Sequence, residues 1–328
     1  MRMIARVVIA ASLAVVVGST GAQAAMTKLT VIMFPGLSGL GFYVAQDKGI
    51  FAKHGLDAEV TYTPTSDFQR KSLAEGKFDI AQSAADNAVY MVDSGAGDAV
   101  IVAGGSNSMN ELMARPDVHG FADIRGKAVV VDAPNTAFAF LLYKMLALNG
   151  LKKGDYTVAP KGGTPQRLAA MKADPNNVAG IVSPPFNFKA EKDGFHSLGS
   201  TVKLIGAYQG DSVIVMRSWA KTHGDALERY LAALIEANRW AFDPANRKAL
   251  SAILAKRVKL DSAEIEASVE AAVGPQGGFA RDIRFDPDGF KTVLALRAEF
   301  AGPPGAKPPA ADKYIDLSYY QRALAAVR

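Results

Sequence analysis

The stretch from Gly126 to Gly150, GKAVVVDAPNTAFAFLLYKMLALNG, decides how the rest of the chain is interpreted. Its apolar run Ala128 to Val131 predicts a short buried strand. That run ends in side chains that favour turns and helix starts, namely those of Asp132, Pro134 and Asn135. Apolar residues then recur at helical spacing up to a closing Asn-Gly pair, which predicts a helix with one apolar face. That face consists of Phe138, Leu141, Leu142, Met145 and Leu148.

The start of this helix is a candidate ligand site. Its first amides, near Asn135, Thr136 and Ala137, have no partner within the helix. They can donate hydrogen bonds to a ligand placed beyond the end of the sheet. A capped strand-turn-helix unit without any ligand explains the same residues, so the remainder of the chain has to decide.

Composition limits the possible function classes. The chain has 328 residues, 49% of them hydrophobic and 21% charged, which is typical of a globular protein with one large or two medium domains. The net charge is +5, and acidic and basic residues are interspersed, so no nucleic-acid partner is expected. Because the chain has no cysteine, disulfides, thiolate metal sites and cysteine nucleophiles are excluded. The four histidines lack metal-ligand spacing, so we predict neither a metal nor a cofactor.

The first 24 residues have the features of a secretory signal peptide. Arg2 and Arg6 precede an apolar run, Val7 to Val17, that is too short to span a bilayer. Ala22-Gln23-Ala24 is a small-x-small cleavage site. A membrane anchor, or a true start at Met26, would be the alternatives. We expect cleavage near Ala24 and a mature protein in the periplasm.

Strand and helix patterns alternate through the first hundred residues and again after Gly104-Gly105-Ser106. This alternation predicts an α/β fold with two lobes, each a mostly parallel sheet with helices on both faces. From Asp225 onward the pattern is helical, apart from a Pro/Gly-rich segment at 302–309, so we expect a helical C-terminal tail. Besides the run in the opening stretch, the expected strands are Lys28 to Met33, Asp57 to Tyr62, Phe78 to Ala81, Ala99 to Ala103, Glu111 to Ala114, Tyr156 to Ala159, Val178 to Val182, Thr201 to Ile205 and Ser212 to Met216.

Four of the expected strands end in turns of small or polar residues. Ligands of open α/β sheets bind outside the carboxyl ends of the strands, and small residues let backbone amides approach them. The repetition of this arrangement favours a binding site over four unrelated turns. The turns are Pro35 to Ser38, Ser83 to Asp86, Asp132 to Asn135 and Ser183 to Pro185.

Several side chains near these turns allow two interpretations. Asp86 could accept a hydrogen bond from a ligand amine or ring NH, or it could cap its own helix. Tyr208 and Phe42 could stack on a ligand ring, or they could belong to the core. Ser183 lies in no Gly-x-Ser-x-Gly motif, so a serine hydrolase is unsupported.

A set of short motifs resembles a known family. Phe42-Tyr43-Val44-Ala45, Lys48-Gly49-Ile50-Phe51 and His54-Gly55-Leu56-Asp57 resemble the opening of periplasmic solute-binding proteins of ABC importers. The similar branch binds nitrate, sulfonates, taurine or thiamine pyrimidines. Leu73 to Ile80 and Phe121 to Lys127 are similar to two later motifs of that branch. In order, the motifs cover about residues 28 to 260.

The resemblance implies a type II periplasmic-binding fold with a ligand in the cleft between two lobes. One lobe would hold residues 26–108 plus 209–328, the other 109–208, and a hinge motion would close them. The implied partners are a small organic ligand and the permease and ATPase of an importer in the inner membrane, and the protein would be a monomer. Together with the strand-end argument, the expected ligand-binding residues are Leu37, Ser38, Ser83, Ala84, Asp86, Asn135, Thr136, Ala137, Pro184 and Tyr208.

Two other functions stay open at this level. An enzyme that makes a pyrimidine shares the implied fold, but its cysteine-rich motif is missing here. A binding protein that serves a membrane sensor would look the same in sequence as one that serves a permease. Within the branch, sulfonate-binding members have a Gly-Ser turn where this chain has Pro134-Asn135-Thr136.

Overall fold

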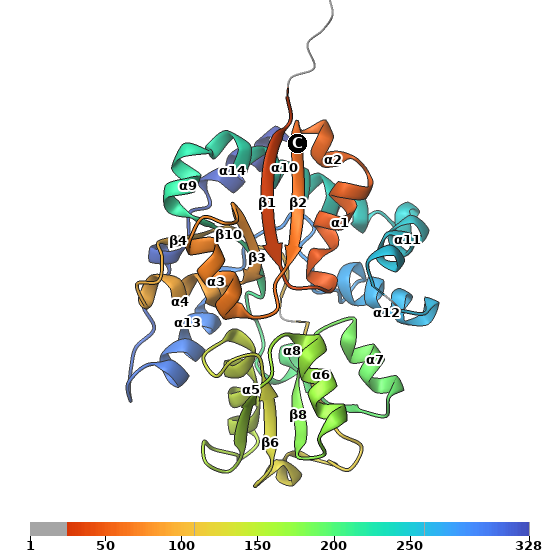
Figure 1. The fold of residues 1–328 in the computed structure, drawn as a ribbon, viewed down its shortest axis with the longest axis vertical. Coiled ribbons are helices and arrows are strands. Elements are labelled where there is room, and N and C mark those ends of the chain that lie inside the picture. The colour runs from red at the N-terminus through yellow and green to blue at the C-terminus, as the bar shows by residue number, and fades with distance from the viewer. Residues whose placement is uncertain (1–24, 108, 259, 328) are drawn as a thin grey trace, which may run out of the picture.

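A computed structural model describes residues 25–107, 109–258 and 260–327. The expected signal peptide, residues 1–24, lies outside this range. The described chain forms two five-stranded sheets, one above the other in Figure 1, with helices around both. The described chain passes from one sheet to the other within residues 104–107 and 109–110, and back within residues 205–210.

The upper sheet has the strand order β2-β1-β3-β10-β4. β1 runs parallel to β2 and β3, whereas β10 runs antiparallel to both of its neighbours, β3 and β4. β10 is thus the single reversed strand of this sheet. The strands are β1 (Thr27–Met33), β2 (Leu56–Tyr62), β3 (Ile80–Ala84), β4 (Ala99–Ala103) and β10 (Asp211–Met216).

The lower sheet repeats this plan with the order β7-β6-β8-β5-β9. β6 is parallel to β7 and β8, and β5 is antiparallel to β8 and β9. The prediction of mostly parallel sheets is confirmed, with one reversed strand in each. The strands are β5 (Glu111–Ala114), β6 (Ala128–Val131), β7 (Thr157–Pro160), β8 (Asn177–Val182) and β9 (His196–Ser200).

Helices cover both sheets, and the C-terminal third is helical as expected (Figure 1). In this part α10 packs against α1 and α14, while α13 reaches down to α5 below the upper sheet. No helix in the described ranges is long and apolar enough to cross a membrane. The helices are α1 (Leu40–Asp47), α2 (Ile50–Lys53), α3 (Ser66–Ala74), α4 (Ala85–Asp93), α5 (Ala137–Leu148), α6 (Thr164–Ala173), α7 (Phe186–Lys192), α8 (Thr201–Leu204), α9 (Arg217–Thr222), α10 (Gly224–Phe242), α11 (Arg247–Arg257), α12 (Ser262–Val273), α13 (Pro287–Ala301) and α14 (Ser318–Ala326).

The opening stretch folds as its pattern predicts, into β6 followed by α5. β6 is buried from Val129 to Val131, and α5 packs its apolar face into the core of the lower sheet. Leu142 and Met145 are fully buried there. Leu148, in the last turn, is 55% exposed, because the helix leaves the core before its apolar pattern ends.

Two local predictions were wrong. Thr201 to Ile205 was expected to be a strand but forms the short helix α8, and the strand of this region is the preceding β9. The Ser200 hydroxyl accepts a hydrogen bond from the Lys203 amide, which caps α8 and favours the helix over a longer strand. The turn expected at Ser83 to Asp86 is also misplaced, since β3 continues through Ala84 and passes directly into α4.

Candidate functional site

A cavity lies where the two sheets face each other. It has a volume of about 860 Å³ when the part open to solvent is included. Its walls come from the segments that follow β1, β6 and β8, and from the junction of β3 with α4. β10 contributes as well. Because it runs antiparallel to β3, its first residue, Asp211, pairs with Ala84, the last residue of β3, and lies at the same edge.

Seven of the ten expected ligand-binding residues line this cavity, and three do not. Ser83 lies in a buried network behind the wall, where its hydroxyl donates to Gln69 Oε1 at 2.6 Å and accepts from Asn87 Nδ2 at 2.6 Å. Asn87, which the sequence did not single out, lines the cavity in its place. The seven lining residues are Leu37, Ser38, Ala84, Thr136, Ala137, Pro184 and Tyr208.

Asp86, the second residue outside the wall, belongs to a buried ion pair. Arg297 of α13 donates from Nε and Nη2 to the two carboxylate oxygens of Asp86, each at 2.7 Å. Asp86 is 1% exposed and the Arg297 residue 9%. Burial alone would lower the pKa of Arg297, but the attraction of Asp86 outweighs it and raises that pKa. The charge of Asp86 is therefore already balanced within the protein.

Asn135 is the third residue outside the wall; it is exposed and does not line the cavity. Its backbone carbonyl accepts a hydrogen bond from Arg297 at 3.3 Å. The neighbouring residue Thr136 caps α5, because its hydroxyl oxygen accepts from the Ala139 amide at 3.4 Å. Thr136 and Ala137, rather than Asn135, therefore bring the start of α5 to the cavity.

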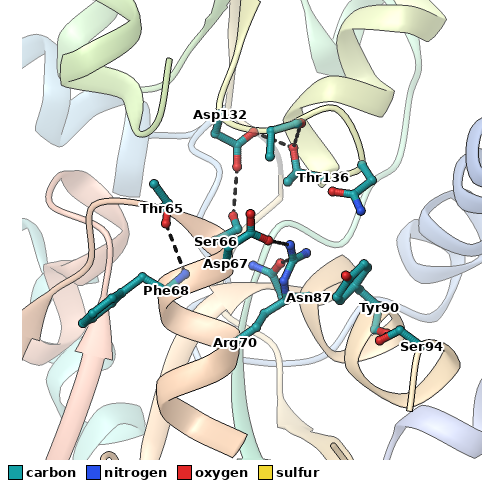
Figure 2. Close-up of polar contacts among 12 residues, drawn as sticks. Thr65, Ser66, Asp67, Phe68, Arg70, Asn87, Tyr90, Ser94, Asp132 and Thr136 are labelled. Carbon is teal, nitrogen blue, oxygen red and sulfur yellow. Dashed lines mark hydrogen bonds and ion pairs between the residues drawn. The ribbon is translucent and has the colours of Figure 1, made fainter. Parts of the chain in front are cut away.

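Asp132 joins the two sides of the cavity. Its carboxylate accepts hydrogen bonds from Thr136 in its own turn and from Ser66 at 2.9 Å (Figure 2). Ser66 begins α3, which follows β2 of the upper sheet, whereas Asp132 follows β6 of the lower sheet. Two backbone contacts also cross the cavity edge, from the Gly163 amide to the Pro64 carbonyl at 3.1 Å and from the Leu37 amide to the Pro184 carbonyl at 3.4 Å. The structure is thus closed over the cavity.

Arg167 of α6 is a lining residue that the sequence analysis missed. It is fully buried, and its guanidinium donates to the Ile181 carbonyl at 3.1 Å, the Gly162 carbonyl at 2.8 Å and the Thr164 hydroxyl at 2.9 Å. Burial lowers the pKa of Arg167 to about 10, against the opposing attraction of Asp132. Arg167 therefore remains a cation at neutral pH.

Asp211 was also missed. It lines the cavity and accepts one side-chain hydrogen bond, from the Ser106 hydroxyl at 2.9 Å. Burial raises the pKa of Asp211 to about 6, and the bond from Ser106 opposes that rise only in part. The cavity therefore contains one buried arginine and two carboxylates in different surroundings.

Comparison with known proteins shows to which family the chain belongs. The model of the NMT1-like family matches residues 22–255, which is well over half of the sequence. The chain belongs to the NMT1-like family. A relative named as a binding protein in Brucella abortus is 27% identical over 226 residues, which cover 68% of this chain and 69% of the relative.

Solved structures similar to this NMT1-like chain show the same fold. The periplasmic nitrate-binding protein NrtA from Synechocystis has a TM-score of 0.77 at 17% identity, covering 92% of this chain and 89% of its own. The alkanesulfonate-binding protein SsuA from Xanthomonas axonopodis, bound to MOPS, has a TM-score of 0.74 at 17% identity, covering 88% and 98%. The desulfurization enzyme DSZB is more distant, with a TM-score of 0.62 at 13% identity, covering 92% and 100%. The fold is thus that of periplasmic binding proteins, and one enzyme shares it.

The two aromatic side chains that the sequence offered as partners for a ligand ring lie in different places of this NMT1-like chain. Tyr208 is 2% exposed, and burial, together with the nearby charge of Asp86, raises the pKa of its hydroxyl well above 10. Phe42 is not at the cavity and packs in the core against Phe51 at 5.0 Å between ring centres. Within the described residues no group of three or more histidines and carboxylates is placed to hold a metal ion.

Proposed function

We propose that this protein captures a small organic solute in the cavity between its two sheets and delivers it to the permease and ATPase of an ABC importer in the inner membrane. The observation that carries the proposal is the cavity itself, which is built from strand ends of both sheets and closed by direct contacts between them. The names of its relatives and structural neighbours, which include binding proteins for nitrate and alkanesulfonate, support the same function.

In this proposal the sheets are the cores of two lobes, residues 26–108 plus 209–328 and residues 109–208. Within the described ranges the chain passes between the sheets in residues 104–107, 109–110 and 205–210, so a change of backbone angles there would swing one lobe against the other. Opening would break the hydrogen bond between Ser66 and Asp132. A ligand that touches both sides favours the closed state, because its contacts are complete only there.

The proposal also covers where the protein works. Residues 1–24 would direct export and be removed near Ala24, which leaves a monomer in the periplasm with no nucleic-acid partner. A mature N-terminus near Ala25, found by mass spectrometry of the native protein, would support export. The same protein could hand its solute to a membrane sensor, and a permease and ATPase encoded beside it would favour import.

A pair of substitutions tests the site. Ser38 lines the cavity, whereas Ser218 is exposed on α9, far from it. We expect Ser38→Phe to fill the cavity and abolish the rise in melting temperature that a screened solute gives, with the circular dichroism spectrum unchanged. Ser218→Phe adds the same side chain and should keep the wild-type response. Equal solute affinity of all three proteins by calorimetry would show that the cavity is not the site.

The fate of the bound solute tests the absence of catalysis. A binding protein returns its ligand unchanged, so mass spectrometry after long incubation should recover the intact solute. Conversion of the solute, lost on Ser38→Phe and kept on Ser218→Phe, would instead favour an enzyme, as the distant likeness to DSZB allows.

A further inference from the structure

The charges in the cavity differ in how the protein balances them. Among the described residues, the charged side chains that line it are Asp132, Arg167 and Asp211. Asp132 and Arg167 attract each other, and Asp132 also accepts two hydroxyl hydrogen bonds. Asp86, just behind the wall, is paired with Arg297. Asp86 is therefore in contact with a cation, and Asp132 is attracted by one.

Asp211 has no such partner. Within the described ranges of the chain, no lysine, arginine or histidine forms an ion pair with its carboxylate, and its side-chain hydrogen bond comes from the neutral hydroxyl of Ser106. A carboxylate that is partly removed from water, as that of Asp211 is, is unfavourable unless a cation or several donors compensate it. The raised pKa of Asp211 has this cause, since burial is its largest contribution.

A second, smaller cavity continues from Asp211. Ser38 and Asp211 line both cavities, and the smaller one also reaches Ser212 and Asn238. Asn238 is 3% exposed, yet its Oδ1 has no hydrogen-bond partner among the described residues. Buried polar atoms are normally paired, so this oxygen marks a place for a hydrogen-bond donor.

The space in front of Asn238 depends on a glycine. A Cβ atom added at Gly41 would lie 3.0 Å from Asn238 Oδ1, so any larger residue there would crowd that oxygen. Asp211 and Asn238 thus lie at one small volume that carries a net negative charge.

We propose that the Asp211 end of the cavity binds a positively charged N–H group of the ligand, with Asn238 accepting a further hydrogen bond from it. This inference rests on the proposed function and names the ligand class, a small solute with a cationic nitrogen. A nitrogen cation supplies the compensating charge that Asp211 lacks and the N–H donor that Asn238 Oδ1 lacks. An anionic ligand group at this end would face an unbalanced carboxylate and is disfavoured.

A charge-matched screen tests the inference. The probes are small aryl and alkyl skeletons, each ending in an ammonium, a hydroxyl, a carboxylate or a sulfonate, so that only the charge of the end group varies. Melting curves identify the probes that stabilise the wild-type protein, and calorimetry measures their affinity. We expect the stabilising probes to carry the ammonium group.

Variants assign the effect to one residue. Asp211→Asn should weaken ammonium binding at least tenfold. Asp312→Asn, which makes the same change at an exposed site, should leave it within twofold of wild type. Circular dichroism and melting curves check that each variant is folded.

The outcomes separate this inference from the function on which it rests. Stabilisation by carboxylates or sulfonates alone, or equal ammonium affinity in wild type and in Asp211→Asn, would overturn the assignment while leaving a binding protein. If no probe binds and protein purified from the periplasm contains no solute, the proposed function itself fails and the inference fails with it.

Discussion

Replacing Arg297 by methionine should destabilise the protein strongly. Methionine keeps most of the side-chain length but removes the two hydrogen bonds that Arg297 donates to Asp86. Asp86, which is 1% exposed, would then be a buried carboxylate without a cation. Breaking one partner of a buried ion pair costs about 3–5 kcal/mol, so Arg297→Met should lower the free energy of unfolding by that amount.

Not all of this loss would come from the ion pair. Arg297 also donates to the Asn135 carbonyl at 3.3 Å, and its guanidinium lies 5.1 Å from the centre of the Phe140 ring. The double variant Asp86→Leu/Arg297→Met removes the unpaired charge of Asp86 but does not restore these other contacts of Arg297. It should therefore be more stable than Arg297→Met alone, by about 2 kcal/mol or more, since an apolar pair can replace a buried ion pair.

Urea denaturation at pH 7, followed by circular dichroism, measures these differences. Arg322→Met is the matched control, because Arg322 pairs with Glu228 at the surface, where its side chain is 51% exposed. That variant should lose about 1 kcal/mol or less. A loss of under about 1 kcal/mol in Arg297→Met, or a double variant no more stable than the single one, would refute the reasoning.

Two further predictions concern the cavity. The pKa of Asp211 is raised from its ordinary value of 3.8 to about 6 in the folded protein. The free energy of unfolding of the wild type should therefore fall as the pH rises from about 4 to above 6, by up to about 3 kcal/mol, whereas that of Asp211→Asn should not. Melting curves should show the variant more stable than wild type at pH 8, with the advantage shrinking at pH 4; a difference independent of pH would contradict this. Ser66→Ala removes the buried hydrogen bond to Asp132 across the cavity and should weaken solute binding about fivefold, or about 1 kcal/mol, by calorimetry. Ser94→Ala, at an exposed helix end, is its control, and equal affinities would show that this bond does not hold the cavity closed.

Sequence reasoning succeeded where the deciding interactions are local. The bounds of β6 match the predicted run Ala128 to Val131, because a short apolar segment between turn residues has few alternatives to a buried strand. Thr136 lies four residues after Asp132 and caps α5 from within the same turn, so its place near the site followed from the sequence alone. The alternation of such units was enough to predict the two sheets.

It failed where a residue's partner is distant in the chain. Asp86 was expected to meet a ligand, but Arg297, which is 211 residues away, neutralises it. Nothing near Asp86 in the sequence indicates that partner. Arg167 had a weak local signal, since it lies four residues before Met171 on the buried face of α6. An arginine in line with buried apolar residues could have been recognised as a buried cation.

The reversed strand β10 explains why the sequence analysis did not predict Asp211 as a cavity residue from the ends of the expected strands. A ligand site is expected among residues that follow parallel strands, because the carboxyl ends of such strands meet at one edge of a sheet. β10 joins the sheet between β3 and β4 in the opposite direction, so its amino end, Asp211, reaches that same edge. The chain enters β10 directly from the segment 205–210 that passes between the sheets. Asp211 therefore lies both at the cavity wall and beside the proposed hinge, so a cation bound there would contact the residue that follows the hinge segment itself.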